Sequence, residues 1–210
     1  MEARWVKQTV EPMLDGREVF LDSDDLQDLT KLLNHVLESE VLVLMQTSEI
    51  IARPWMILEV HTAVTHNIPI VALFIRGKGY NFDTSPQILN HLDTQLDQLN
   101  PGASKVLQQF GVEPVDAAYL LSQVVPNVIS IELNNSASKK VLEASMQDLV
   151  QHLKNAKPCQ ISLTKEEWLE HREVNFPVKP KDLAVVPPEI PELPRGFVFR
   201  PDVVVQIKER

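Results

Sequence analysis

The sequence predicts an α/β fold of the flavodoxin-like, three-layer type, in which helices cover both faces of a parallel sheet. Short apolar runs alternate along the chain with segments whose apolar residues recur every three or four positions, a pattern typical of alternating strands and helices. Several of these runs are continuously apolar, as expected of strands that are buried on both faces. The chain has 210 residues, of which 44% are hydrophobic and 23% charged, so it can bury a core of ordinary size.

The first three predicted elements follow this alternation. Residues 18–22, Glu-Val-Phe-Leu-Asp, form a short apolar run that predicts a strand. Residues 26–39 are predicted to form a helix, because their apolar side chains recur at three- and four-residue spacings and fall on one face. Residues 40–45, Glu-Val-Leu-Val-Leu-Met, predict a second strand that is buried on both faces.

A second helix and a third strand come next. Pro54 favours a helix that begins at its own position and runs through about His66, with Asn67 as the stop. Residues 68–75 form another apolar run and predict a third buried strand, after which a loop begins at Arg76.

The same patterns predict the remaining elements of the body. Helices are expected over residues 86–99 and 114–124, and a fourth strand over residues 128–133. A final helix is expected from a cap at Ser136 to about Asn155. Since ligands of such sheets bind beyond the carboxyl ends of the strands, the connections that follow the first three strands are the expected functional edge. These connections are residues 22–28, 47–55 and 76–85.

The composition changes at about residue 158. Eight of the 15 prolines lie from Pro158 onward, and proline excludes regular helix, so this tail is predicted to be an extended connector. One short helix is expected within it, where Thr164 and Glu167 have the spacing of a capping box. The predicted organisation is therefore a body over residues 1–157 and a proline-rich linker over residues 158–210.

Residues 18–75 together resemble a Toll/interleukin-1 receptor (TIR) domain. Four pieces carry the resemblance, and they come in the order that the family has. They are VFLD with an Asp-rich turn, the helix end and strand VLES and VLVLMQTS, the Trp-x-x-x-Glu helix within RPWMILE, and the strand IPIVALF. The resemblance implies a TIR-like fold and a role in signal transduction of the innate-immunity or cell-death type.

The end of the tail carries a second resemblance. Residues 191–208 are similar to the segment that precedes the nucleotide-binding domain of NB-ARC-type STAND ATPases. The sequence has no Gly-x-x-x-x-Gly-Lys-Ser/Thr motif, so ATP binding is not expected. The two resemblances imply the amino-terminal part of a TIR–NB-ARC receptor that is truncated at both ends.

The amino-terminal residues depart from the TIR pattern. The family has a first strand in the centre of its sheet, between its second and third strands. Residues 1–17 offer no such strand and look more like the end of the first helix. The sheet is therefore expected to lack a central member, and unpaired strand edges there would need to be repaired or would associate.

Glu59 is the sharpest catalytic candidate. It lies four residues after Trp55, so the two side chains share one face of the predicted helix. By resemblance to TIR enzymes that cleave the nicotinamide–ribose bond of NAD⁺, Glu59 would stabilise the oxocarbenium-like transition state and Trp55 would line the substrate pocket. The alternative is that Glu59 is an ordinary helix residue paired with Arg53 or with solvent.

An acidic turn and one serine complete the predicted substrate site. Asp24 lies in the acidic turn over residues 22–25, which by resemblance would be a loop that closes over the pocket or bridges protomers. The same turn also suits the N-terminus of the following helix, where carboxylates cap backbone amides and favour the dipole. Ser48 is the further substrate-binding candidate, beside the pocket.

The composition and the spacing of its histidines argue against several other functions. A net charge of −9 argues against coating nucleic acid or binding an anionic membrane, and no apolar run is long enough to span a bilayer. The single cysteine, Cys159, excludes a disulfide framework and has no basic neighbour that would activate it. His61 and His66 are five residues apart and do not align as a metal pair.

The sequence thus predicts a cytoplasmic TIR signalling domain with no resident cofactor or metal, whose partners are other TIR domains or further copies of itself. NAD⁺ is its possible substrate, hydrolysed on self-association. The alternative is a non-catalytic module for homotypic binding. A response-regulator receiver is disfavoured, because Asn134 and Asn135 follow the fourth strand where that family needs a lysine.

Overall fold

Five strands form one sheet in the computed structural model, whose described residues are 2–21, 31–176 and 205–208. The spatial order is β1 (Glu18–Leu21), β5 (Val205–Lys208), β2 (Val41–Gln46), β3 (Ile70–Ile75) and β4 (Ser130–Leu133). The β2–β3 and β3–β4 pairs are parallel, whereas β5 is antiparallel to both of its neighbours. The α/β class and a parallel three-strand core flanked by helices are therefore confirmed.

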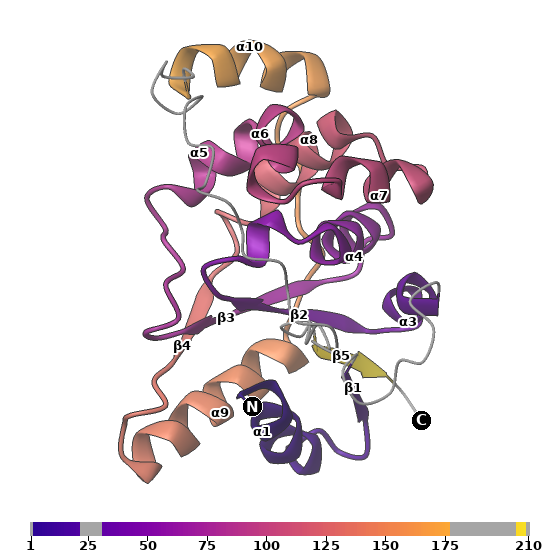
Figure 1. Cartoon of the computed structure of the whole chain (residues 1–210). Helices are drawn as coiled ribbons and strands as arrows, with labels where there is room; N and C mark the ends of the chain where they lie inside the picture. The colour runs from indigo at the N-terminus through magenta and orange to yellow at the C-terminus, as the bar shows by residue number, and fades with distance from the viewer. Residues whose placement is uncertain (1, 22–30, 177–204, 209–210) are drawn as a thin grey trace, which may run out of the picture.

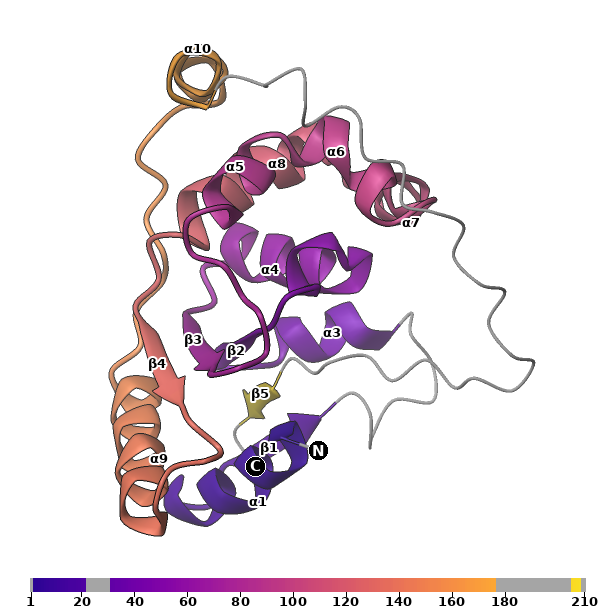
Figure 2. The same cartoon turned by 60° about the vertical axis from the view of Figure 1, so that its left-hand side comes forward.

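Helices cover the two faces of this sheet (Figures 1 and 2). Helices α1 and α9 lie on one face, α3 and α4 lie on the other, and α5 to α8 form a further layer outside α4 (Figure 1). Their bounds are α1 Glu2–Val10, α3 Leu32–Leu37, α4 Pro54–Thr65, α5 Ser85–Asn90, α6 Leu92–Leu99, α7 Ala103–Gln109, α8 Pro114–Val124, α9 Lys139–Lys154 and α10 Lys165–Asn175. Short 3₁₀ turns at Glu11–Met13 and Ile50–Ala52 follow α1 and precede α4.

Strand β2 shows how the apolar pattern builds two cores. All six of its residues are buried, and successive side chains point to opposite faces of the sheet. Leu42 and Leu44 pack into the cluster that includes α4 and α8, while Val43 and Met45 pack into the cluster that includes α1 and α9. The continuously apolar sequence of β2 therefore reflects burial of the strand on both faces of the sheet.

The helix predicted over residues 86–99 is interrupted. Helix α5 ends at Asn90 and α6 begins at Leu92, because His91 leaves helical geometry with φ −120° and ψ 23°. A ring nitrogen of His91 hydrogen-bonds the carbonyl oxygen of Phe176, far along the chain. The helix break therefore coincides with a long-range contact, which the local spacing of apolar residues does not reveal. Helix α7, which follows Gly102 at φ 85°, was not predicted.

The described part of the predicted linker packs against the body. Helix α10 begins with the predicted capping box, since Thr164 accepts from the Glu167 amide and Glu167 accepts in return from the Thr164 amide. Before it, Cys159, Ile161 and Leu163 pack on the α4-side core. Helix α10 itself lies over α5, α6 and α8 (Figure 1).

One interior position of the sheet, next to its edge strand β1, is occupied by residues 205–208. Residues 1–17 were expected to supply no central strand, and from Glu2 onward they form α1 and the 3₁₀ turn. The position between β1 and β2 is filled instead by β5, which the sequence analysis placed in a linker. The predicted gap is thus closed by an antiparallel strand from the other end of the chain.

Candidate functional site

Two of the three connections predicted to form the functional edge meet at the carboxyl ends of β2 and β3. The backbone amide of Ser48 donates to the carbonyl oxygen of Lys78 at 2.9 Å. Gly79 has φ +76°, and a Cβ atom there would lie 3.1 Å from the Cβ of Ser48, so the close approach favours glycine. The third connection, which includes Asp24, lies outside the described residues.

A buried polar cluster lies beneath this contact. Tyr80, Ser85 and Gln46 are all buried here, and burial raises the pKa of Tyr80 while the nearby polar side chains of Ser85 and Gln46 oppose the rise. The side-chain Oε1 of Gln46 and Oγ1 of Thr47 are buried with no hydrogen-bond partner in the described part of the chain. Buried polar atoms normally have hydrogen-bond partners, so these two are exceptions, and both lie at the carboxyl end of β2.

An aromatic side chain stands above the cluster on the loop over residues 76–85, here called the edge loop. Phe82 is 51% exposed, and its ring contacts Phe74 and Tyr80 at centroid distances of 5.1 and 4.9 Å. Two ion pairs tie the start of the loop to the body: Arg76 with Glu132 at 3.1 Å and Lys78 with Glu2 at 2.8 Å. Because both ion pairs are open to solvent, the half-exposed ring is held mainly by its contacts with Phe74 and Tyr80.

Trp55 and Glu59 lie on α4 as predicted, where Trp55 is partly buried and Glu59 is fully buried. The Trp55 ring packs edge-on against Phe110, with centroids 5.1 Å apart and planes at 72°. Glu59 is 2% exposed, in a run where residues 56–60 are all buried. A carboxylate is rarely buried so fully in an ordinary amphipathic helix. The predicted pair is thus part of the packed layer in the single chain, with Trp55 against α7.

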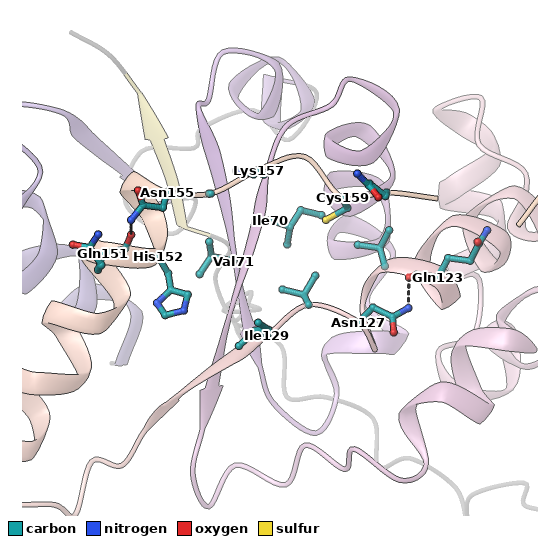
Figure 3. A pocket seen from close by; sticks show the side chains of 14 residues that line it. Ile70, Val71, Gln123, Asn127, Ile129, Gln151, His152, Asn155, Lys157 and Cys159 are labelled. Atoms are coloured by element: carbon teal, nitrogen blue, oxygen red, sulfur yellow. Dashed lines mark hydrogen bonds between the residues drawn. The ribbon is translucent and has the colours of Figure 1, made fainter. Parts of the chain in front are cut away.

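The larger cavity lies at the opposite edge of the sheet (Figure 3). Its volume is about 460 Å³, and it is bounded by the start of β3 and the carboxyl ends of α8 and α9. Side chains that line it include Ile70, Val71, Gln123, Asn127, His152 and Cys159. Neither Trp55 nor Glu59 lines this cavity or the shallow one beside α10. Sequence reasoning missed it, because its walls come from distant segments with no shared motif.

Cys159 in this cavity is expected to react slowly. Burial raises the pKa of its thiol, and a hydrogen bond with the Ile70 backbone only partly offsets this. The reactive thiolate is therefore scarcer at a given pH than in a free cysteine, whose pKa is about 8.5. We expect the rate of alkylation by iodoacetamide to keep rising above pH 9 in the folded chain, and to level off earlier in urea. Equal pH profiles in both states would contradict this.

Two further searches of the described residues gave negative results. No three His, Cys, Asp or Glu side chains gather as metal ligands within residues 2–21, 31–176 and 205–208. In the same ranges, every helix is too short or too polar to cross a bilayer.

Comparison of the chain with protein-family models, with curated proteins and with solved structures found no match. The resemblance to TIR domains therefore stays a prediction from the sequence. The candidate functional features are the edge loop with Phe82, the polar cluster beneath it, and the buried Glu59 on α4.

Proposed function

We propose that this chain is a TIR-like signalling module that acts by homotypic association through its edge loop. The proposal starts from the resemblance of residues 18–75 to the TIR family. The single observation that supports this surface is Phe82, an aromatic side chain half exposed at the carboxyl edge of the sheet.

Phe82 has the properties of an interface anchor. Large aromatic side chains dominate the energetics of many protein interfaces. The contacts with Phe74 and Tyr80 already restrict the ring, so little conformational entropy is lost when a partner covers it. The ion pairs of Arg76 and Lys78 are open to solvent and add little to this restraint.

Replacing Phe82 with serine is expected to weaken self-association at least about tenfold, which corresponds to about 1.4 kcal/mol. Sedimentation velocity over a range of protein concentrations measures this. Leu99→Ser is the matched control, because Leu99 is 48% exposed at the end of α6, away from the edge loop. Circular dichroism would verify that both variants fold. Equal association of the wild type and Phe82→Ser, or equal loss in both variants, would contradict the proposal.

NAD⁺ hydrolysis by Glu59 is the second candidate function. The observation that favours it is a carboxylate at 2% exposure, one helical turn beyond Trp55 on the helix that follows β2. The unpartnered acceptors of Gln46 and Thr47 lie at the end of the same strand and suit the hydroxyl donors of a ribose. The two unpartnered atoms of Gln46 and Thr47 would be costly to bury without a use.

The chemistry asked of Glu59 is electrostatic. The bond between ribose C1′ and the nicotinamide nitrogen breaks with its electron pair on nitrogen, which leaves an oxocarbenium-like ribose that water then attacks. An ionised Glu59 would stabilise that positive charge. Because Glu59 is covered in the single chain, turnover in this proposal depends on a rearrangement that accompanies self-association.

A further inference from the structure

We propose that the interior position of the sheet between β1 and β2 is a strand-binding site that accepts residues 205–208 from a second copy of this chain. Two copies would then exchange their β5 strands reciprocally. This inference does not rest on the proposed function, since it concerns the strand position between β1 and β2 and not the edge loop.

The pairing around β5 differs from that of the other strands. Strand β5 is antiparallel to β1 over Glu18–Leu21 and to β2 over Val41–Val43, while the rest of the sheet is parallel. The strand therefore inserts between two neighbours that come from a distant part of the chain. Its backbone hydrogen bonds depend only on these two flanking strands and not on the copy that provides it.

The position is costly to leave empty. Val19 and Leu21 on β1, and Val41 and Val43 on β2, belong to one apolar cluster on either side of β5. Removal of β5 would leave two strand edges with unpaired amides and carbonyls in the middle of this core. Such edges are templates for another strand, so a chain that releases its own β5 is an acceptor for the same segment of a neighbour.

The connection to β5 is long enough for exchange. Helix α10 and the turn after it end at Phe176, and about 28 residues separate them from Val205, a length that reaches up to about 90 Å when extended. A compact chain of this size has a radius of gyration of only about 17 Å. A tether of this length limits the effective concentration of the strand within its own chain, so the strand of a second copy competes at high protein concentration.

Cysteine pairs placed across the register test the exchange. Val43 lies opposite Val205, and directly opposed residues of an antiparallel pair have Cα atoms close enough for a disulfide. In a Cys159→Ser background, one chain carries only Val43→Cys and a second carries only Val205→Cys. The two are mixed at high concentration, oxidised and separated on a non-reducing gel. We expect a covalent heterodimer, because only an exchanged strand brings the two thiols together.

Two further mixtures of cysteine variants serve as a negative control and as an independent repeat of the test. A mixture of Val205→Cys with Val141→Cys, an exposed position on α9, is expected to give much less heterodimer, because Val141 does not pair with β5. Glu18→Cys with Lys208→Cys repeats the test at another register pair, and Glu18 is exposed, so this substitution avoids the core.

A chain that carries both Val43→Cys and Val205→Cys is expected to form the disulfide within itself at low concentration and between copies at high concentration. A link within single chains at every concentration, with no heterodimer in either mixed pair, would overturn the exchange. Failure of the doubly substituted chain to link at all would overturn the strand-binding site itself. Phe82→Ser is expected to leave the linkage intact, which separates this inference from the proposed function.

Discussion

Replacing Trp168 with alanine is expected to lower the free energy of unfolding by about 3–5 kcal/mol, the range for deletion of a fully buried aromatic side chain. Trp168 is 1% exposed, and its indole Nε1 donates to Asn90 Oδ1 at 2.9 Å. Its ring contacts Tyr119 at 5.7 Å and carries the guanidinium of Arg172 at 4.6 Å from the centroid. The substitution removes all of these contacts and opens a cavity between α10 and the body.

The same substitution disturbs the polar groups that surround Trp168. Arg172 lies between Trp168 and Asp93, with Nη1 at 3.0 Å from both carboxylate oxygens of Asp93, and it also donates to the Asn90 carbonyl oxygen. Both ionised side chains of this pair are largely buried, so a loosened geometry leaves charges that are poorly compensated. We therefore expect α10 to detach in the variant rather than repack.

Urea unfolding followed by circular dichroism gives the change in stability, and hydrogen exchange over residues 165–175 reports whether α10 detaches. Leu169→Ala is the control, because Leu169 is next to Trp168 on α10 and is exposed. A loss of less than about 1 kcal/mol in Trp168→Ala, or an equal loss in both variants, would contradict the role of Trp168 as the anchor of α10.

The second large effect concerns catalysis. If Glu59 stabilises the oxocarbenium-like ribose, then Glu59→Gln is expected to lower the rate of nicotinamide release from NAD⁺ by about 10²-fold or more. Glutamine keeps the shape of the buried side chain and removes only its charge, so the packing between Met56 and Val60 is retained.

Glu49→Gln is the matched control for this measurement. Glu49 is an exposed carboxylate just before α4, and its ion pair with Arg53 at 3.8 Å is accessible to solvent and weak. Nicotinamide release is measured at low and high protein concentration, because turnover is expected to follow self-association. Equal release from Glu59→Gln and Glu49→Gln would exclude Glu59 as the catalytic carboxylate. No release from the wild-type chain at any concentration would exclude the hydrolase.

Local patterns predicted the elements around the parallel core. The β2 and β3 strands are continuously apolar, and Pro54 begins α4 where its fixed φ angle suits the first turn. Asn67 ends that segment at φ +58°, a conformation that asparagine tolerates better than most residues. These features depend on a few neighbouring residues, so the sequence expresses them directly.

Long-range contacts escaped prediction. The helix break at His91 goes with a contact to Phe176, and the strand at residues 205–208 pairs with partners that are far away in the chain. Neither leaves a periodic trace in the sequence. The proline content of the tail predicted a linker. It gave no sign that residues 205–208 form a strand of the sheet.

The candidate site was predicted in part. Ser48 and the edge loop meet as the strand-end rule requires, and Trp55 and Glu59 share α4. The packing of Trp55 depends on Phe110 at the end of α7, which lies far along the chain. One feature of the sequence could have indicated the polar cluster, namely the polar residue Gln46 at the end of the otherwise apolar strand β2.

Hydrogen exchange of the wild-type chain at low and high protein concentration tests the central proposal most directly. If copies associate through the edge loop, backbone amides of residues 76–85 gain protection at high concentration, together with those around Ser48 that contact the loop. Protection that appears only elsewhere, or no concentration-dependent protection at all, would contradict the assignment of the edge loop as the association surface.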